Sequence, residues 1–393
     1  MSETQIISRT SIPLAGAATG VRKRTLFLSA RSQEPCGVET FTRTLVAALA
    51  ACDPEAAQEA AQEADQEADH ELVSVSGRWR DVPALLYGIA QADRVVFGFP
   101  LVAWKRMLVI PLVLLLFAWA TRRRISTFAH EWAGLNWLRR VVLSPYLLLS
   151  HNILVLSPLI LRQIADDPFV GRTARKCALV PHPPTVRRPQ ARTVTDTARS
   201  IERAARDADL VIGHFGAIYH GKAAIALLEV CDHLRGRGIR ALLVFIGGFT
   251  RSLDDYEGRF RARLRELALE DQVIVTGYVS TTEEVFALLE RIGVSVFLFP
   301  EGLTARRSSV ITCLQSNRPV VVSAPQSRDE FRHHQGLTRL IDAGALSFVP
   351  RSASVAEIAD RLLAAVAEPT DAIPPIDADA WWAATTDATR AAL

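Results

Sequence analysis

Short apolar runs alternate along the chain with segments whose apolar residues recur at helical spacing. In the first half, the runs that predict strands are 25–30, 72–75, 94–98, 124–128 and 153–156, the last of which is expected to close that half. Residues 38–51 have the spacing of an amphipathic helix. Strands that alternate with helices predict a parallel sheet covered on both faces.

The same alternation restarts after a proline-rich, basic stretch at 181–192, PHPPTVRRPQAR. The strands predicted in this second half are 210–214, 241–247, 273–276, 294–299 and 320–323, and the helices include 222–234 and 256–268. A chain of 393 residues is long enough for two separate hydrophobic cores. We therefore expect an α/β protein of two doubly wound, Rossmann-like domains that face each other across a cleft.

Changes in composition divide the chain further. We expect a mobile leader at 1–24, a first domain at 25–185, a linker at 186–207, a second domain at 208–368 and a tail at 369–393. The tail contains Trp381 and Trp382 and is expected to dock back on the first domain.

An acidic low-complexity insert, PEAAQEAAQEADQEADHE, occupies 54–71 of the first domain. Its glutamates recur at every fourth position, where like charges repel on a helix, and it has no apolar face. We expect a solvated helical extension or a disordered insert, and an interaction role is the alternative.

The apolar segment at 107–120 has 14 residues, fewer than the roughly 20 that span a bilayer. Basic residues flank it on both sides. Two interpretations remain open: a core helix between two strands, or a helix that lies in the surface of a membrane with its arginines at anionic head groups. The second predicts an anionic membrane surface as a partner, contacted through 101–124 and 137–150.

Composition excludes several classes of protein. The 45 Lys and Arg residues nearly balance the 42 Asp and Glu residues, which does not favour nucleic acid as a partner. The five cysteines are scattered without metal-ligand spacing, and the first 24 residues lack the apolar core of a secretory signal. We expect a cytoplasmic protein with no bound metal.

Charged residues gather in the loop that follows the predicted strand 294–299. Glu301, Arg306 and Arg307 lie in this loop, and Ser308 and Ser309 then open a helix. Guanidinium groups beside a helix N-terminus are suited to a diphosphate, and a carboxylate on the same loop to hydroxyl groups. This pattern predicts a binding site for a sugar nucleotide.

A second loop, GHFGAIYHGK at 213–222, also joins a predicted strand to a helix. Gly216 and Lys222 fit a phosphate seat, and a plain glycine-containing turn is the alternative. A nucleotide triphosphatase P-loop would need Ser or Thr after the lysine, where Ala223 stands. Gly248, after the strand at 241–247, is expected to leave room for a phosphate or a base.

In the first half, two strand ends carry candidate residues. His130 and Glu131 follow the strand 124–128, at the edge of a parallel sheet where ligands bind. The loop SQEPCGVE at 32–39 contains Gly37 and Glu39, and Gly37 would let the backbone approach a ligand closely.

Taken together, these segments resemble the GT-B glycosyltransferases, and among them glycosyltransferase family 4. In the second half the resemblance lies in FGAIYHGK, VIVTGYVSTTEEVFALLERIGVSVFLFPEG and NRPVVVSA, and in the first half in CGVETFTRTLVAAL and HEWAGL. The family usually has a second glutamate in its donor motif, and here Ser309 or Thr312 stands in that place, depending on where the count starts.

The resemblance implies a glycosyltransferase that moves a sugar from a UDP-, GDP- or other nucleotide-diphosphate sugar to a saccharide or lipid-linked acceptor, with retained configuration, no metal and no separate cofactor, in polysaccharide or glycoconjugate biosynthesis. It implies catalytic roles for His130 and Glu301. The residues that it implies at the donor diphosphate are Lys222, Arg306, Arg307, Ser308, Ser309 and Gly216. Gly248 and Thr312 would contact the nucleotide and its ribose, and Gly37, Glu39 and Glu131 would line the acceptor side. A catalytically silent partner subunit and a P-loop-like enzyme are the alternatives.

Overall fold

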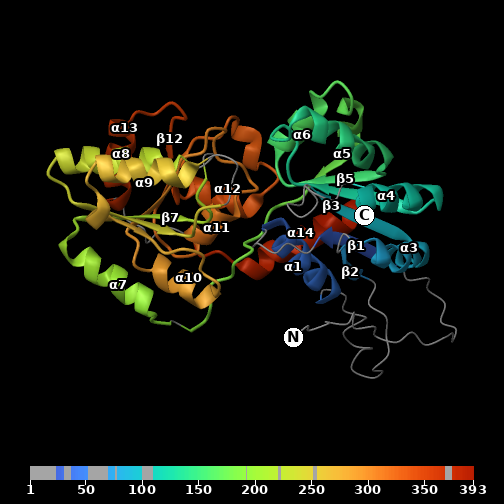
Figure 1. Ribbon diagram of the computed structural model, residues 1–393, viewed down its shortest axis with the longest axis horizontal. Coiled ribbons are helices and arrows are strands. Elements are labelled where there is room, and N and C mark those ends of the chain that lie inside the picture. Colours follow the sequence, from blue (N-terminus) through green and yellow to red (C-terminus); the bar gives the residue numbers. More distant parts are fainter. Residues whose placement is uncertain are drawn as a thin grey trace.

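The computed structural model describes residues 24–30, 37–51, 70–75, 78–99, 109–191, 193–219, 223–250, 255–367 and 374–393. These residues form two six-stranded parallel sheets, each with helices on both faces, which lie side by side in Figure 1. The expected architecture of two doubly wound α/β domains is therefore present.

The first sheet has the strand order β2-β1-β3-β4-β5-β6. Its strands are β1 Thr25–Ala30, β2 His70–Val75, β3 Arg94–Phe99, β4 Arg124–Ala129, β5 Asn152–Val155 and β6 Cys177–Leu179. The helices of this domain are α1 Gly37–Ala51, α3 Val82–Gln91, α4 Val109–Ala120, α5 Trp137–Leu149 and α6 Pro158–Ala165, with 3-10 turns η1 Trp79–Asp81 and η3 Gly171–Lys176.

The second sheet has the strand order β12-β11-β10-β7-β8-β9. Its strands are β7 Leu210–Phe215, β8 Ala241–Ile246, β9 Val273–Val275, β10 Val294–Phe297, β11 Val320–Ser323 and β12 Leu346–Val349. The helices are α7 Asp196–Ala204, α8 Ala224–Gly236, α9 Tyr256–Glu266, α10 Thr282–Leu289, α11 Ser308–Leu314, α12 Gln335–Asp342 and α13 Val355–Ala367, with 3-10 turns η4 Ala205–Asp207, η6 Glu270–Gln272 and η7 Arg328–Phe331.

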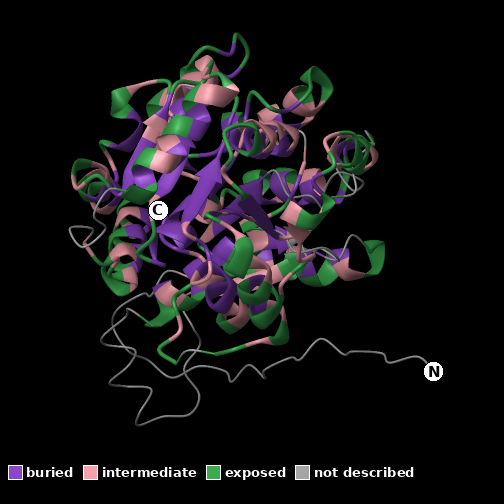
Figure 2. Ribbon diagram, turned by 90° about the vertical axis from the view of Figure 1, so that its left-hand side faces the viewer, coloured by how far each residue is buried: buried purple, intermediate pink, exposed green. Residues whose placement is uncertain are grey.

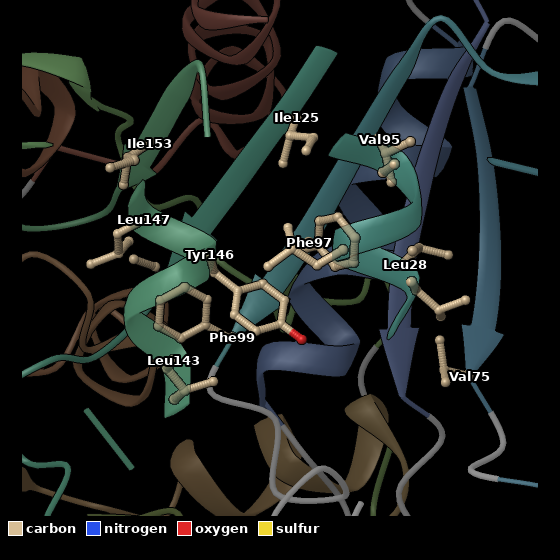
Figure 3. Close-up of a cluster of buried hydrophobic side chains, with 14 of the residues drawn as sticks. Leu28, Val75, Val95, Phe97, Phe99, Ile125, Leu143, Tyr146, Leu147 and Ile153 are labelled. Atoms are coloured by element: carbon tan, nitrogen blue, oxygen red, sulfur yellow. The ribbon is translucent and has the colours of Figure 1, made fainter. Parts of the chain in front are cut away.

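Each sheet separates two layers of apolar side chains. In the first domain, one layer packs the sheet against α3, α4, α5 and α6, and the other packs it against α1. Figure 3 shows part of the first layer, in which Phe97 and Phe99 lie against Tyr146 of α5 with ring centroids 5.4 Å and 5.8 Å apart. Figure 2 shows the resulting pattern, with buried strands inside and exposed residues on the outer faces of the helices.

The last helix, α14 Ala378–Ala392, returns to the first domain and packs on α1. Trp382 lies 6.1 Å from Phe41 with stacked rings, and its indole nitrogen donates to the Pro184 carbonyl at 3.1 Å. Arg390 donates to the Leu49 carbonyl at the end of α1. The end of the chain thereby covers the outer face of the first sheet.

Several expected boundaries were wrong. The range 186–207 expected to be a linker contains α7, whose Ala198 and Ile201 are buried in the core of the second domain. The strand 153–156 does not close the first half, because β6 pairs beside β5. Strands β6 and β12 are only three and four residues long, and each includes half-buried residues, so neither has a strong apolar signal.

The expected ranges of the acidic insert and of the leader were also too long. Residues 52–69 and 1–23 lie outside the described part, but Glu71 belongs to the edge strand β2 and pairs with Arg24 at 2.6 Å. The amide of Arg24 also donates to the Asp93 carboxylate. An edge strand tolerates such charges because one of its sides faces solvent.

Helix α4, within the apolar segment 107–120, combines features of both interpretations. Its Ile110, Leu114 and Leu115 are buried in the core, whereas Leu116 and Trp119 are exposed. None of the helices in the described residues is both long and apolar enough to span a bilayer.

Candidate active site

The second sheet has a topological switch point between β7 and β10. The chain leaves these neighbouring strands in opposite directions, and doubly wound sheets bind ligands at the carboxyl ends of such strands. The loop with Gly216 follows β7, and the loop with Glu301, Arg306 and Arg307 follows β10. The two predicted phosphate-binding loops are therefore neighbours at the place where such sheets bind ligands.

The carboxyl edges of the two sheets meet at the domain junction. His333 contacts the Leu156 carbonyl, beyond β5, at 3.3 Å, and the His334 Nε2 lies 2.8 Å from the His182 carbonyl, beyond β6. Glu330 of η7 accepts hydrogen bonds from Ser157 and from the Leu159 amide. These contacts bring the loops of both sheets to one site.

Arg306 and Arg307 share one carboxylate. The Nη2 of Arg306 lies 3.4 Å from the Glu301 Oε1, and Arg307 donates to the same oxygen. The guanidinium of Arg307 also lies over the Phe299 ring, 4.3 Å from its centroid. Glu301 therefore orients the two cations in this structure, in addition to any contact with hydroxyl groups.

Arg306 connects the two domains electrostatically. Burial lowers the pKa of Arg306, and the neighbouring Arg307 lowers it further, whereas Glu131, Glu301 and Tyr219 raise it. Glu131 belongs to the first domain, so a carboxylate from each domain acts on this guanidinium. The Nε atoms of both arginines are buried and have no hydrogen-bond partner among the described residues. Donors left unpaired in this way are available to an anionic ligand.

His130 lies at the carboxyl end of β4, where its amide donates to the Phe99 carbonyl at 2.9 Å. Its ring stacks on Phe128 with centroids 5.0 Å apart and meets Phe41 edge-on at 5.5 Å. Burial, with a smaller contribution from Arg306, lowers the pKa of His130 to about 3. The imidazole is therefore neutral at physiological pH.

Glu131 does not orient His130. Its carboxylate folds against Gly134, where a Cβ atom would lie 2.0 Å from the Oε1. No hydrogen bond joins the two side chains in the described part of the structure, so the effect of Glu131 on the site is its charge near Arg306.

The glycine loops after β7 and β8 pack on each other. Gly216 and Gly247 have φ of 107° and 147°, and a Cβ on Gly247 would lie 2.3 Å from the Gly216 carbonyl oxygen. The Ile218 amide donates to the Gly248 carbonyl at 2.9 Å. Glycine is thus required at 247 by close approach of two backbones.

The helix after the arginines departs from expectation at Thr312. Ser308 and Ser309 begin α11 and are partly exposed, as a ligand contact requires. Thr312 is fully buried, and its hydroxyl donates to the Ser308 carbonyl at 3.0 Å. The Thr312 hydroxyl is therefore used by the helix's own backbone, and its expected contact with ribose stays a prediction.

The remaining predicted residues lie at the edge of the site or outside the described part. Gly37 begins α1, and no described atom lies within 4 Å of the position of a Cβ, so packing does not demand glycine there. Glu39 pairs with Arg43 at 2.7 Å along α1. Lys222 is outside the described residues, and Ala223 precedes α8.

Sequence reasoning missed two buried residues of this junction, His182 and Glu330. His182 lay in the proline-rich stretch 181–192, at the end of the expected first domain, and Glu330 in a polar stretch without periodicity. A histidine flanked by prolines at the end of a domain was the one available signal.

Comparison with known proteins agrees with this architecture. No protein-family model and no curated protein matches the sequence. HepE from Anabaena, solved with UDP and glucose, superimposes with a TM-score of 0.61 at 13% identity, over 94% of this chain and 95% of that one. A UDP-forming α,α-trehalose-phosphate synthase from Burkholderia xenovorans gives 0.57 at 12% identity, over 94% and 96%.

The fold is shared by more than one kind of enzyme. A putative UDP-N-acetylglucosamine 2-epimerase from Listeria monocytogenes matches with a TM-score of 0.50 at 8% identity, over 89% of each chain. Identities this low establish the fold, and the reaction has to be argued from the site. The protein is a two-domain α/β protein with the GT-B fold.

Proposed function

We propose that the protein is a glycosyltransferase that takes a sugar from a nucleotide-diphosphate sugar and transfers it to a saccharide or lipid-linked acceptor. The observation that carries the proposal is the half-buried pair Arg306 and Arg307 at the switch point of the second sheet, facing His130 and Glu131 of the first. Two guanidiniums with unpaired donors match a diphosphate in charge and in hydrogen bonding.

The reaction breaks the bond between the anomeric carbon and the diphosphate oxygen and forms a bond from that carbon to an acceptor hydroxyl oxygen. Negative charge develops on the leaving diphosphate, and Arg306 and Arg307 stabilise it, so the site has no need of a metal. Gly216, the Ser308 and Ser309 segment and Lys222 complete the diphosphate seat in this proposal.

The acceptor hydroxyl has to lose a proton. His130 is a poor base because its pKa is about 3, and Glu301 is already paired with both arginines. The proton therefore passes to the departing diphosphate, on the face where the new bond forms, which gives the retained configuration that the resemblance to family 4 implies.

Nucleotide binding tests this proposal first. Calorimetric titration with UDP, GDP, ADP and their sugars, with and without magnesium, should find one nucleotide preferred without magnesium. UDP and UDP-glucose are the first probes, because HepE was solved with them. Arg306→Ala should weaken binding roughly 10 to 150-fold, the value of one or more charged hydrogen bonds. Arg199→Ala on α7, outside the site, is the matched control.

Turnover separates an enzyme from a silent partner subunit. Slow release of sugar from the donor, lost in Glu301→Gln, supports the transferase. Equal nucleotide affinity of wild type and Arg306→Ala would refute the diphosphate assignment, and binding without any donor cleavage would favour the silent subunit.

We propose further that the protein binds its acceptor at a membrane surface. Helices α4 and α5 cover the same face of the first sheet, and their outer sides expose large apolar side chains. These side chains are Val109, Leu116 and Trp119 on α4, and Trp137, Leu138, Val141 and Leu148 on α5. Exposed Arg122 and Arg124 follow α4 directly. Apolar side chains beside cations match the surface of an anionic bilayer.

Co-sedimentation with vesicles tests this surface. Binding to anionic vesicles should fall with salt and with Trp119→Ser or Trp137→Ser, because both indoles would insert at the interface. Tyr278→Ser, which removes an equally exposed aromatic ring from the second domain, should leave binding unchanged. Wild-type protein that never sediments with anionic vesicles would contradict the proposal.

A further inference from the structure

The segment that crosses between the domains carries a histidine to which the proposed reaction gives no role. His182 follows β6, and only 5% of its surface is exposed. The backbone around it is fixed from two sides. The Pro181 and Pro184 carbonyls accept from Thr385 and Trp382 of α14, at 3.0 Å and 3.1 Å, and the His182 carbonyl accepts from His334 at 2.8 Å. The imidazole is therefore held in place.

His182 lies beside His130. The two imidazoles meet the same phenyl ring, that of Phe41, edge-on, at centroid distances of 5.2 Å for His182 and 5.5 Å for His130. Each histidine is also close enough to Arg306 for that cation to lower its pKa. A residue of the first sheet, one of the crossover and one of the second sheet thus converge.

Each of the two imidazoles contains a buried ring nitrogen. The His182 Nδ1 and the His130 Nε2 have no hydrogen-bond partner among the described residues. Other histidines differ in this respect: the His151 Nδ1 accepts from the Ile125 amide at 3.1 Å and both ring nitrogens of His334 are used, whereas the buried His333 Nδ1 also has no partner among the described residues. Burial of a polar atom without a partner is unfavourable, so two such nitrogens around one phenyl ring and near one guanidinium indicate that a ligand pairs with them.

The chemistry of the pair selects the ligand group. Burial lowers the pKa of both histidines to about 3, so the rings are neutral, and each offers one donor and one acceptor. A hydroxyl group is likewise both donor and acceptor. A phosphate offers only acceptors at neutral rings and is better matched by the adjacent guanidiniums of Arg306 and Arg307.

We propose that His182 and His130 together bind hydroxyl groups of the donor's sugar, and that His182 is a residue that determines which sugar is accepted. This inference rests on the proposed glycosyltransferase function. It divides the site into a cationic part for the diphosphate and a neutral, imidazole-lined part for the sugar ring.

Binding of UDP and of UDP-glucose to wild type and to His182→Phe tests the inference. The variant keeps a flat ring of similar size and removes both ring nitrogens. UDP affinity should stay within about twofold, and UDP-glucose affinity should fall roughly 5 to 10-fold, the effect of one lost neutral hydrogen bond. His182→Asn, which restores a donor and an acceptor, should recover part of the loss and serves as the second variant if the first does not fold.

Controls separate this role from a structural one. His151→Phe changes a histidine at the opposite edge of the first sheet and should leave both affinities unchanged. His182→Phe should also reduce the ratio of kcat/KM between UDP-glucose and UDP-galactose, which a purely structural role would not alter. Equal losses for UDP and UDP-glucose, or no loss for either, would overturn the inference while leaving the glycosyltransferase proposal intact. Wild-type protein that binds no nucleotide would overturn both.

Discussion

Replacement of Glu330 is the sharpest test of how the two domains are joined. This side chain is 2% exposed and lies in η7 of the second domain. Its Oε1 accepts from the Ser157 hydroxyl and from the Ala305 amide at 3.2 Å, and its Oε2 accepts from the Leu159 amide at 3.2 Å. Arg162 adds a charge at 3.7 Å. One carboxylate therefore binds donors from both domains, including the residue next to Arg306.

Glu330→Ala should destabilise the protein by about 3 to 5 kcal/mol, as expected when one partner of a buried charged network is removed. Three donors would lose their acceptor, which costs about 1 to 3 kcal/mol for each buried donor. Water that enters the vacated space would recover part of this free energy. Glu330→Gln keeps the size and one acceptor oxygen, so it should cost about 1 to 3 kcal/mol. UDP affinity should fall in Glu330→Ala, because the Ala305 amide next to Arg306 loses its acceptor.

Urea denaturation of wild type and variants measures the loss, and calorimetry measures UDP binding. Asp329→Asn on the same turn, where the carboxylate is exposed and pairs with Arg332 at 3.0 Å, is the matched control and should change stability by less than about 1 kcal/mol. A Glu330→Ala variant as stable as Asp329→Asn would refute the view that this carboxylate joins the domains.

The pH dependence of the same variants has a definite sign. Burial raises the pKa of Glu330 above its ordinary value of 4.5, although the bonds from Ser157 and Ala305 oppose the shift. Below pH 4.5 the carboxyl is protonated in the folded and the unfolded chain. Between pH 4.5 and the raised pKa, the unfolded chain ionises at this residue and the folded chain does not, so stability falls as the pH rises. The advantage of wild type over Glu330→Gln should therefore narrow above pH 4.5, and an advantage that widens with pH would contradict the cause given for the shift.

Three further predictions concern single residues. Gly247→Ala should destabilise the protein by about 1 to 3 kcal/mol, because φ is 147° and a Cβ would lie 2.3 Å from a backbone oxygen, whereas Gly236→Ala, with open space around it, should not lower the melting temperature. Thr312→Val should leave UDP affinity unchanged in calorimetry, because that hydroxyl bonds to the Ser308 carbonyl, and a loss above threefold would restore the ribose contact. Wild type should lose stability as the pH falls from 6.5 toward about 3, because burial lowers the pKa of His130 and the folded chain resists protonation there. His130→Phe should remove part of this loss in urea denaturation, and identical pH profiles of the two proteins would refute the prediction.

Much of the fold could be predicted from local pattern. The run at 241–247 predicted a strand because a strand buried on both faces is apolar at every position, and all six residues of β8 are buried. Strand β6 was missed because a three-residue, half-buried strand has a weak local signal. Helix α7 was missed although Thr195 caps it and its buried Ala198 and Ile201 have helical spacing, because it follows directly on the proline-rich stretch.

The residues of the candidate site likewise fall into those that the sequence identifies and those that only the fold brings together. Arg306 and Arg307 could be found from sequence, because charged residues that follow a buried strand must emerge at the carboxyl edge of the sheet. Glu330 and His182 could not. Glu330 bonds to Ser157, which is 173 residues away in the chain, and His182 meets Phe41 from the opposite end of the first domain's sequence.

The alternation of strands and helices, the two domains and the loop with the paired arginines could be recognised in the sequence, because they depend on periodicity and on neighbours in the chain. The packing of the folded chain sets three further features: Thr312 is buried, Glu301 pairs with both arginines, and His130 and His182 lie near Arg306. Those features depend on how the two sheets pack against each other. A contact or a buried position that this packing creates cannot be recognised from the order of residues along the chain.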